Sequence, residues 1–301
     1  MNYKTVVLIN DKAIYNTRYR SVLIQYLLES GYIIDNIGVF DGPKSLYLAL
    51  VSLLKKEKLI LSSNLRANLF VLMFPWRRAL IILNGLGRWR KYKVFRIFLL
   101  SLLSVNRKTI LVQNFADYRY IRLYAKVNCA WMPGSGGSKR EIGTTNEFLV
   151  VTRFDKFPDV IDSVLDFCVY NPNKNVYIVG CSDSEIKEIC GLRSGALKLK
   201  GCGYVKQKNL FKAGNKFIQP DGYGEGIPHS LVDALSSEMT CYIRRHAYVR
   251  FGLGVLGFRW SPFGNGWGEV INSLEARTKI SSSSVNRQVV RYLELLEVDS
   301  F

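Results

Sequence analysis

A glycine-rich segment that runs into an apolar helix is the part of the sequence best suited to chemistry. It has the sequence QPDGYGEGIPHSLVDAL over residues 219–235, with Glu225 in the loop and Asp233 eight residues later, about two turns into the expected helix. Backbone N–H groups at a helix start attract a phosphate or a polarised hydroxyl. Pro228 suits the first turn, where its missing N–H costs nothing. We therefore expect one acid to meet a sugar hydroxyl and the other a ribose; the alternative is a capped helix with two solvated acids.

Two cations form a second candidate group. Arg153 and Lys156 follow an apolar run, 148–152, that predicts a buried strand. Cations at the end of such a strand can neutralise a diphosphate leaving group; the alternative is ordinary surface charge on a loop. The chain contains no Asp-x-Asp, and it has only two histidines and six scattered cysteines. We therefore expect no metal ion at either group.

Alternating strands and helices must position both groups. Residues 11–17 are expected to form a loop, and residues 69–74 and 79–83 two strands or a strand with a buried helix. The remaining strands are predicted over 4–10, 33–39, 109–113, 148–152, 175–179 and 217–219, and the helices over 21–30, 46–54, 92–105, 158–170, 184–190, 227–235 and 285–296. Such alternation is typical of doubly wound sheets, which bind ligands at the carboxyl ends of their strands. The segment 131–138 (WMPGSGGS) interrupts it as a domain boundary would. The predicted fold class is α/β, with two Rossmann-like domains facing a cleft.

The glycine-rich segment also resembles a known signature. Glu225-Gly-Ile-Pro-x-Ser-Leu-x-Asp233 is similar to the E-x7-E motif of family 4-type glycosyltransferases with the GT-B fold, above all the bacterial branch that builds capsule and O-antigen polysaccharides, although the second acid here is Asp. The resemblance implies that Glu225 contacts the donor sugar or its phosphate and that Asp233 holds ribose hydroxyls. The backbone around them completes the implied donor site: Gly224, Gly226, Ile227 and Pro228.

Further segments resemble the same family in the same order along the chain. They are Asn16-Thr17-Arg18, Asn84-Gly85-Leu86-Gly87, Val112-Gln113-Asn114 with Asp117, Pro133-Gly134-Ser135-Gly136, and Arg153 with Lys156, which the family usually spaces more widely. On the family's pattern Arg18, Gly85, Gly87 and Asp117 line the acceptor side, and Arg153 and Lys156 join Glu225 as catalytic residues on the donor diphosphate. The implied domains are an acceptor-binding domain over 1–138, a donor-binding domain over 139–280, and a helix over 281–301 that crosses back to the first domain.

Positive charge is concentrated in the first half of the chain. The net charge is +18, and residues 1–138 contain 21 of the 42 basic residues but only 6 of the 24 acidic ones. Between residues 74 and 108 basic residues interleave with Trp, Tyr and an apolar helix, a pattern that suits an anionic lipid surface. The cations expected to face the membrane are Arg77, Arg78, Arg88, Arg90, Lys91, Lys93 and Arg96. We expect the helix's apolar residues, from Phe95 to Leu103, to pack inward.

The predicted function is transfer of a hexose or N-acetylhexosamine from a nucleotide sugar to a saccharide acceptor, expected to be polyprenyl-linked. By the resemblance the transfer is retaining and metal-independent, and the nucleotide is UDP rather than GDP. No run of 18 uncharged apolar residues predicts a membrane span, so we expect a cytoplasmic protein bound peripherally to the inner face of the membrane. Two alternatives stay open: a non-catalytic basic protein that binds nucleic acid through its Arg, Trp and Tyr residues, and a degenerate glycosyltransferase-fold scaffold.

Overall fold

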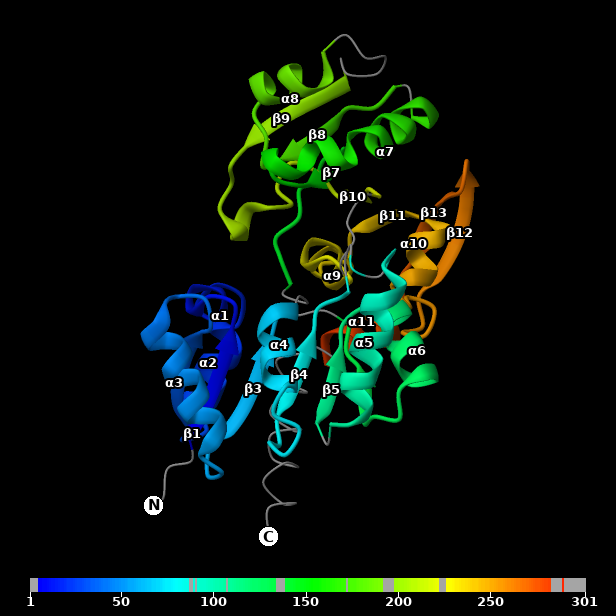
Figure 1. Cartoon of the computed structure of the whole chain (residues 1–301). Coiled ribbons are helices and arrows are strands. Elements are labelled where there is room, and N and C mark those ends of the chain that lie inside the picture. Colours follow the sequence, from blue (N-terminus) through cyan, green and yellow to red (C-terminus); the bar gives the residue numbers. More distant parts are fainter. Residues whose placement is uncertain are drawn as a thin grey trace. The chain divides into compact units, whose positions relative to one another are not determined.

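The computed structural model describes residues 5–86, 89, 91–106, 108–133, 139–171, 173–191, 198–221, 226–282 and 289. The chain divides into two compact units. Unit 1 consists of residues 1–135 together with 283–301, and unit 2 of residues 136–282. Each unit is built around its own sheet, wholly parallel in unit 1 and mostly parallel in unit 2 (Figure 1).

Unit 1 contains a six-stranded sheet in the order β2-β1-β3-β4-β5-β6, and all its strand pairs are parallel. Its strands are β1 (Thr5–Asn10), β2 (Ile33–Gly38), β3 (Leu59–Ser63), β4 (Leu80–Leu83), β5 (Thr109–Val112) and β6 (Cys129–Trp131). Its helices are α1 (Ala13–Tyr19), α2 (Ser21–Glu29), α3 (Pro43–Leu54), α4 (Leu65–Leu72), α5 (Lys93–Ser104) and α6 (Phe115–Tyr124).

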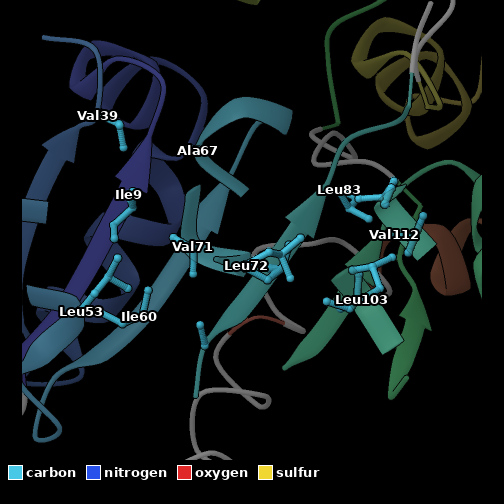
Figure 2. Close-up of a cluster of buried hydrophobic side chains, with 14 of the residues drawn as sticks. Ile9, Val39, Leu53, Ile60, Ala67, Val71, Leu72, Leu83, Leu103 and Val112 are labelled. Carbon is cyan, nitrogen blue, oxygen red and sulfur yellow. The ribbon is translucent and has the colours of Figure 1, made fainter. Parts of the chain in front are cut away.

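The strands of unit 1 are apolar on both sides because helices cover both faces of the sheet. On one face, Ile9, Ile60 and Val112 of the strands pack against α3, α4, α5 and α6 (Figure 2). On the other face, alternate strand residues pack against Leu23 and Leu27 of α2 and against Val289. On the central strands this double burial favours polar side chains near the strand ends.

Unit 2 contains a seven-stranded sheet in the order β12-β13-β11-β10-β7-β8-β9. Its strands are β7 (Phe148–Val151), β8 (Val176–Val179), β9 (Leu199–Gly203), β10 (Lys216–Gln219), β11 (Thr240–Arg244), β12 (Arg259–Gly264) and β13 (Trp267–Ile271). Its α-helices are α7 (Phe157–Tyr170), α8 (Asp183–Cys190), α9 (His229–Ser236), α10 (Arg245–Arg250) and α11 (Leu274–Ser282), and short 3₁₀ turns lie at η2 (Phe154–Lys156) and η4 (Gln207–Asn209). The strands from β7 to β11 are parallel, whereas β13 and β12 are antiparallel.

Local sequence patterns misplaced several elements. Residues 13–19 form α1 although a loop was predicted over 11–17. For residues 69–83 the alternative of a strand with a buried helix is confirmed, since α4 spans 65–72 and β4 spans 80–83. Strands β3, β6, β9 and β11 and the hairpin of β12 and β13 were not predicted. These strands are short and depend on pairing with neighbours distant in the sequence, so they have little periodicity of their own.

Two buried cations lie at the amino ends of unit 1's strands. The Arg77 guanidinium donates to the backbone carbonyls of Lys56 and Lys58, and the Lys108 ammonium donates to the Phe74 carbonyl at 2.8 Å and to the Asn106 side chain. Lys108 is 1% exposed. Burial, and secondarily the charge of Arg77, lowers the pKa of Lys108 to about 8. Arg77 is buried as well, so the prediction that it faces a membrane is wrong.

The lowered pKa of Lys108 makes the stability of unit 1 depend on pH. Between about pH 8 and pH 10.5 the unfolded chain binds the Lys108 proton more tightly than the folded chain does. The buried charge therefore destabilises the folded state fully below pH 8, and this destabilisation decreases as pH rises. Relative to Lys108→Met, the wild-type free energy of unfolding should therefore increase by roughly 2 kcal/mol from pH 7 to pH 10. Urea unfolding of both proteins at each pH measures this, since other titrating groups cancel in the difference. A difference that stays constant with pH would contradict the prediction.

Candidate functional site

The sheet of unit 2 reverses its order between two adjacent strands, β7 and β10. From β7 the chain proceeds outward to β8 and β9, whereas from β10 it proceeds the other way to β11. Ligands of doubly wound sheets bind outside the carboxyl ends of the strands at such a reversal. Arg153 and Lys156 follow β7, and the glycine-rich segment lies between β10 and α9. The topology thus brings the residues that follow β7 and the start of the glycine-rich segment after β10 to the same edge of this sheet.

Among the described residues, the side chains of Arg153 and Lys156 are held by surface ion pairs alone. The Arg153 Nε lies 3.4 Å from Asp155 Oδ1, and both side chains are more than 60% exposed. The Lys156 Nζ lies 3.7 Å from Asp159 Oδ2, with both groups about half exposed. Exposed pairs of this kind contribute little free energy. Both cations can therefore exchange these partners for an anionic ligand at small cost.

The glycine-rich segment leads directly into α9. Gly226 and Ile227 are buried, and Pro228 occupies the position just before the first helical residue, His229. The Pro228 carbonyl accepts from the backbone N–H groups of residues 231 and 232, which begins the helical hydrogen bonding. Glu225 and Gly224 lie outside the described residues.

Asp233 forms a covered ion pair that the sequence did not indicate. Its Oδ2 accepts from Nε and Nη2 of Arg140, each at 3.2 Å, and the two side chains are 5% and 17% exposed. The backbone N–H of Arg140 also donates to Ser237 Oγ at 2.7 Å. These bonds attach the segment around Arg140 to α9. That Asp233 also holds a ribose stays a prediction.

Arg244, at the end of β11, links two carboxylates at the same edge. Its Nη2 donates to Asp166 Oδ2 at 2.6 Å, and its Nε lies 3.1 Å from Asp221 Oδ2. The Trp267 indole N–H also donates to Asp166 Oδ2, at 2.8 Å, and His246 Nε2 lies 2.9 Å from Asp221 Oδ1. Asp221 immediately precedes the glycine-rich residues 222–225. Sequence reasoning missed this network because its members come from α7, the loop after β10, β11, α10 and β13.

The predicted acceptor-side residues of unit 1 lie in different settings. The Asp117 carboxylate is buried and accepts from the Leu86 backbone N–H at 2.9 Å, so it anchors the turn that contains Gly85. Arg18 is exposed in the last turn of α1. Gly87 lies outside the described residues. An acceptor role for this group stays a prediction.

Hydrogen-bonded side-chain amides connect the carboxyl ends of unit 1's strands. Asn10 at the end of β1 donates to Asn16 at 2.8 Å and accepts from Asn64 at 2.6 Å. Asn84, after β4, donates to Asn64 at 2.9 Å and accepts from Arg20 at 3.3 Å. Asn64 has a φ of +70°, which is uncommon for a residue with a side chain. Asn16 is the first residue of the Asn-Thr-Arg segment, which gave a local signal for this edge.

The remaining cations predicted to face a membrane are differently exposed. Arg78, Lys91 and Lys93 are exposed, and Arg96 is half-buried with its guanidinium 5.7 Å from the centre of the Tyr120 ring. Arg88 and Arg90 lie outside the described residues. No described helix has the length and apolar character needed to cross a membrane. In the same described part of the chain, no cluster of His, Cys, Asp or Glu could hold a metal ion.

Comparison with known proteins bears on the fold. No family model and no curated protein matches the sequence. The chain is similar to a solved glycosyltransferase from Rickettsia africae ESF-5, with a TM-score of 0.51 and 8% identity over 80% of this chain and 79% of that one. T4 phage BGT in complex with UDP and Mn²⁺ has a TM-score of 0.46 at 10% identity, over 98% and 97% of the two chains. Acinetobacter baumannii MurG has a TM-score of 0.43 at 10% identity, over 98% and 99%.

These likenesses concern the fold, since each of the three identities is far below 25%, and of these three structures the Rickettsia protein is the one with a TM-score above 0.5. Together with the two parallel sheets, that likeness confirms the predicted class, an α/β chain with two Rossmann-like domains of the GT-B type. Membership of the capsule and O-antigen branch stays a prediction.

The Asp233–Arg140 pair gives a testable prediction about unit 2. Asp233→Asn leaves a covered guanidinium without its carboxylate, so the free energy of unfolding should fall by roughly 2 kcal/mol. Arg140→Met should cause a similar loss, and the double variant should lose clearly less than the sum. Denaturant unfolding of the four proteins measures the coupling. Strictly additive losses would show that the pair contributes nothing.

Proposed function

We propose that this protein is a nucleotide-sugar-dependent glycosyltransferase whose donor site lies at the carboxyl edge of unit 2's sheet. The observation that carries the proposal is the order reversal between β7 and β10. Two accessible cations follow one of these strands, and the glycine-rich segment follows the other. An edge of this kind binds phosphates through backbone N–H groups and cations.

The proposed chemistry assigns a separate role to each group. Arg153 and Lys156 neutralise the diphosphate as it leaves, because charge that develops on the leaving oxygen is stabilised by fixed cations. The start of α9, with the backbone of Gly226 and Ile227, adds N–H groups at the same edge. Glu225 holds a hydroxyl of the donor sugar.

The substrates are proposed from the sequence resemblance. The donor is a UDP-linked hexose or N-acetylhexosamine, transfer is retaining, and no metal ion takes part. The acceptor is a lipid-linked saccharide bound at unit 1, where Arg18, Gly85 and Asp117 are the candidate contacts. Among the structural relatives, T4 phage BGT was solved with UDP and Mn²⁺, so the test must include divalent metal.

Donor binding and hydrolysis test this proposal. The protein is titrated with UDP- and GDP-sugars, with Mn²⁺ or with EDTA, and thermal shift and sugar release are followed. We expect one UDP-sugar to stabilise the protein without metal. Arg153→Gln should weaken its binding about 10- to 100-fold, since a hydrogen bond to a charged group contributes about 1.5–3 kcal/mol, and Glu225→Gln should abolish sugar release.

Glu275→Gln is the matched control, because Glu275 is an 85% exposed acid on α11. Stabilisation by oligonucleotides alone, with steep salt dependence, would instead support a nucleic-acid-binding protein. If UDP binds but no donor sugar is ever released, the scaffold alternative replaces the enzyme.

We further propose that one face of α5 binds an anionic membrane. Val94, Ile97, Phe98 and Val105 fall on one side of the helix by their spacing, and each is at least half exposed. Leu99 and Leu103 are the buried residues of α5. The prediction that the apolar residues from Phe95 to Leu103 pack inward is therefore wrong for Ile97 and Phe98. Their exposure adds to the proposed lipid contact.

Aromatic and basic residues adjoin this face in the sequence. Trp76, Trp89 and Tyr92 are all more than half exposed, and Arg78, Lys91 and Lys93 supply positive charge. Amphipathic aromatic residues and cations next to exposed aliphatic residues suit the headgroup region of an anionic bilayer. An acceptor carried on a membrane lipid would be presented there, at the inner face of the cytoplasmic membrane.

Vesicle sedimentation tests the α5 face. Ile97→Ser combined with Phe98→Ser should reduce binding to phosphatidylglycerol-containing vesicles at least about tenfold, because burial of each apolar side chain contributes about 1.5–3 kcal/mol. Leu54→Ser is the control, since Leu54 is 66% exposed on α3. Equal losses in both variants, or binding that persists in the double variant, would refute the proposed surface.

A further inference from the structure

Arg20 is a buried cation that has no anionic partner among the described residues. It lies between α1 and α2 and is 5% exposed. Burial lowers the pKa of its guanidinium to about 10, so it remains charged at neutral pH. One guanidinium nitrogen, Nη2, donates to Asn84 Oδ1 at 3.3 Å. A second nitrogen, Nη1, is covered and has no hydrogen-bond partner among the described residues.

Three other covered arginines of the described residues have more oxygen atoms around the guanidinium. Arg77 donates to two backbone carbonyls, Arg140 makes two bonds to a carboxylate, and Arg244 lies between two carboxylates. Arg20 has one long bond to a neutral amide. A buried charge with so few partners destabilises the folded state. Proteins retain such destabilising groups mainly where function uses them.

The setting of Arg20 is the place where a doubly wound sheet binds ligands. The order of unit 1's strands reverses between β1 and β3. Asn10 ends β1 and Asn64 follows β3, so the amide network that reaches Arg20 through Asn84 spans the reversal. Asn64 and Asn84 are partly exposed, which opens the network to solvent. The asparagine side chains of this network are neutral, and hydrogen bonds between them fix their positions.

We infer that Arg20, with Asn84 and Asn64, binds an oxyanion of a ligand, a phosphate or carboxylate group, at the carboxyl edge of unit 1's sheet. A guanidinium fork pairs with two oxygens of such a group at once, and the amide N–H groups can donate to the oxygens that remain. The inference goes beyond the proposed function, because it concerns unit 1 and does not require the donor site of unit 2. If unit 1 receives the acceptor, the bound group is an acidic sugar's carboxylate or a lipid carrier's phosphate.

The first experiment compares stability with binding. In the absence of anions, Arg20→Met should be at least as thermally stable as the wild type, because it removes an unmatched buried charge. Inorganic phosphate, titrated at constant ionic strength, should raise the Tm of the wild type, and Arg20→Met should weaken phosphate affinity about tenfold or more. Arg119→Met is the matched control, because Arg119 is an exposed cation of the same unit, and it should respond to phosphate as the wild type does.

Further variants separate this site from the donor site and from simple misfolding. The increase in Tm with phosphate that depends on Arg20 should persist in Arg153→Gln, even if that variant no longer binds nucleotide in unit 2. Arg20→Lys keeps the charge but not the fork and should bind phosphate with intermediate affinity. Acetate and glucuronate in place of phosphate show whether the site prefers a carboxylate. The inference is overturned if Arg20→Met is less stable than the wild type and equally responsive to phosphate, or if the wild type shows no anion response.

Discussion

Burial of parallel strands on both faces is the constraint on which the rest of the structure depends. In unit 1, strand residues such as Ile9 and Leu8 pack against opposite helical layers, so neither side of a strand can hold a polar group without cost. Polar and charged side chains collect at the strand ends. The carboxyl ends carry the amide network of unit 1 and the cations and glycine-rich segment of unit 2, while the amino ends of unit 1 hold Arg77 and Lys108.

The covered arginines differ in the partners that offset the unfavourable burial of their charge. Arg140 and Arg244 are paired with aspartates that lie far away in the sequence, and each pair joins elements of unit 2. Arg77 is held by backbone carbonyls. These arrangements compensate the charge within the protein, and breaking them should mainly affect stability. Arg20 is the contrasting case, because its compensation is incomplete in the protein alone.

The α5 helix combines two roles that usually compete. Leu99 and Leu103 complete the core under unit 1's sheet, whereas Ile97 and Phe98 turn apolar surface outward. A water-soluble surface gains nothing from exposed Phe and Ile residues beside tryptophans. Their concentration beside cations is the physical reason for our proposal that this face contacts an anionic lipid surface.

The sequence by itself determined the alternation of strands and helices, and with it the α/β class. Apolar runs such as 148–151 and helical spacing in 158–170 are local signals. The same strand predictions put Arg153 and the glycine-rich segment directly after strands. Only the tertiary structure decided that β7 and β10 are neighbours, that Asp233 pairs with Arg140, and that Arg77 is buried while Phe98 is exposed. Strand order and the partner of a charge depend on contacts between residues far apart in the chain, and local periodicity carries no information about them.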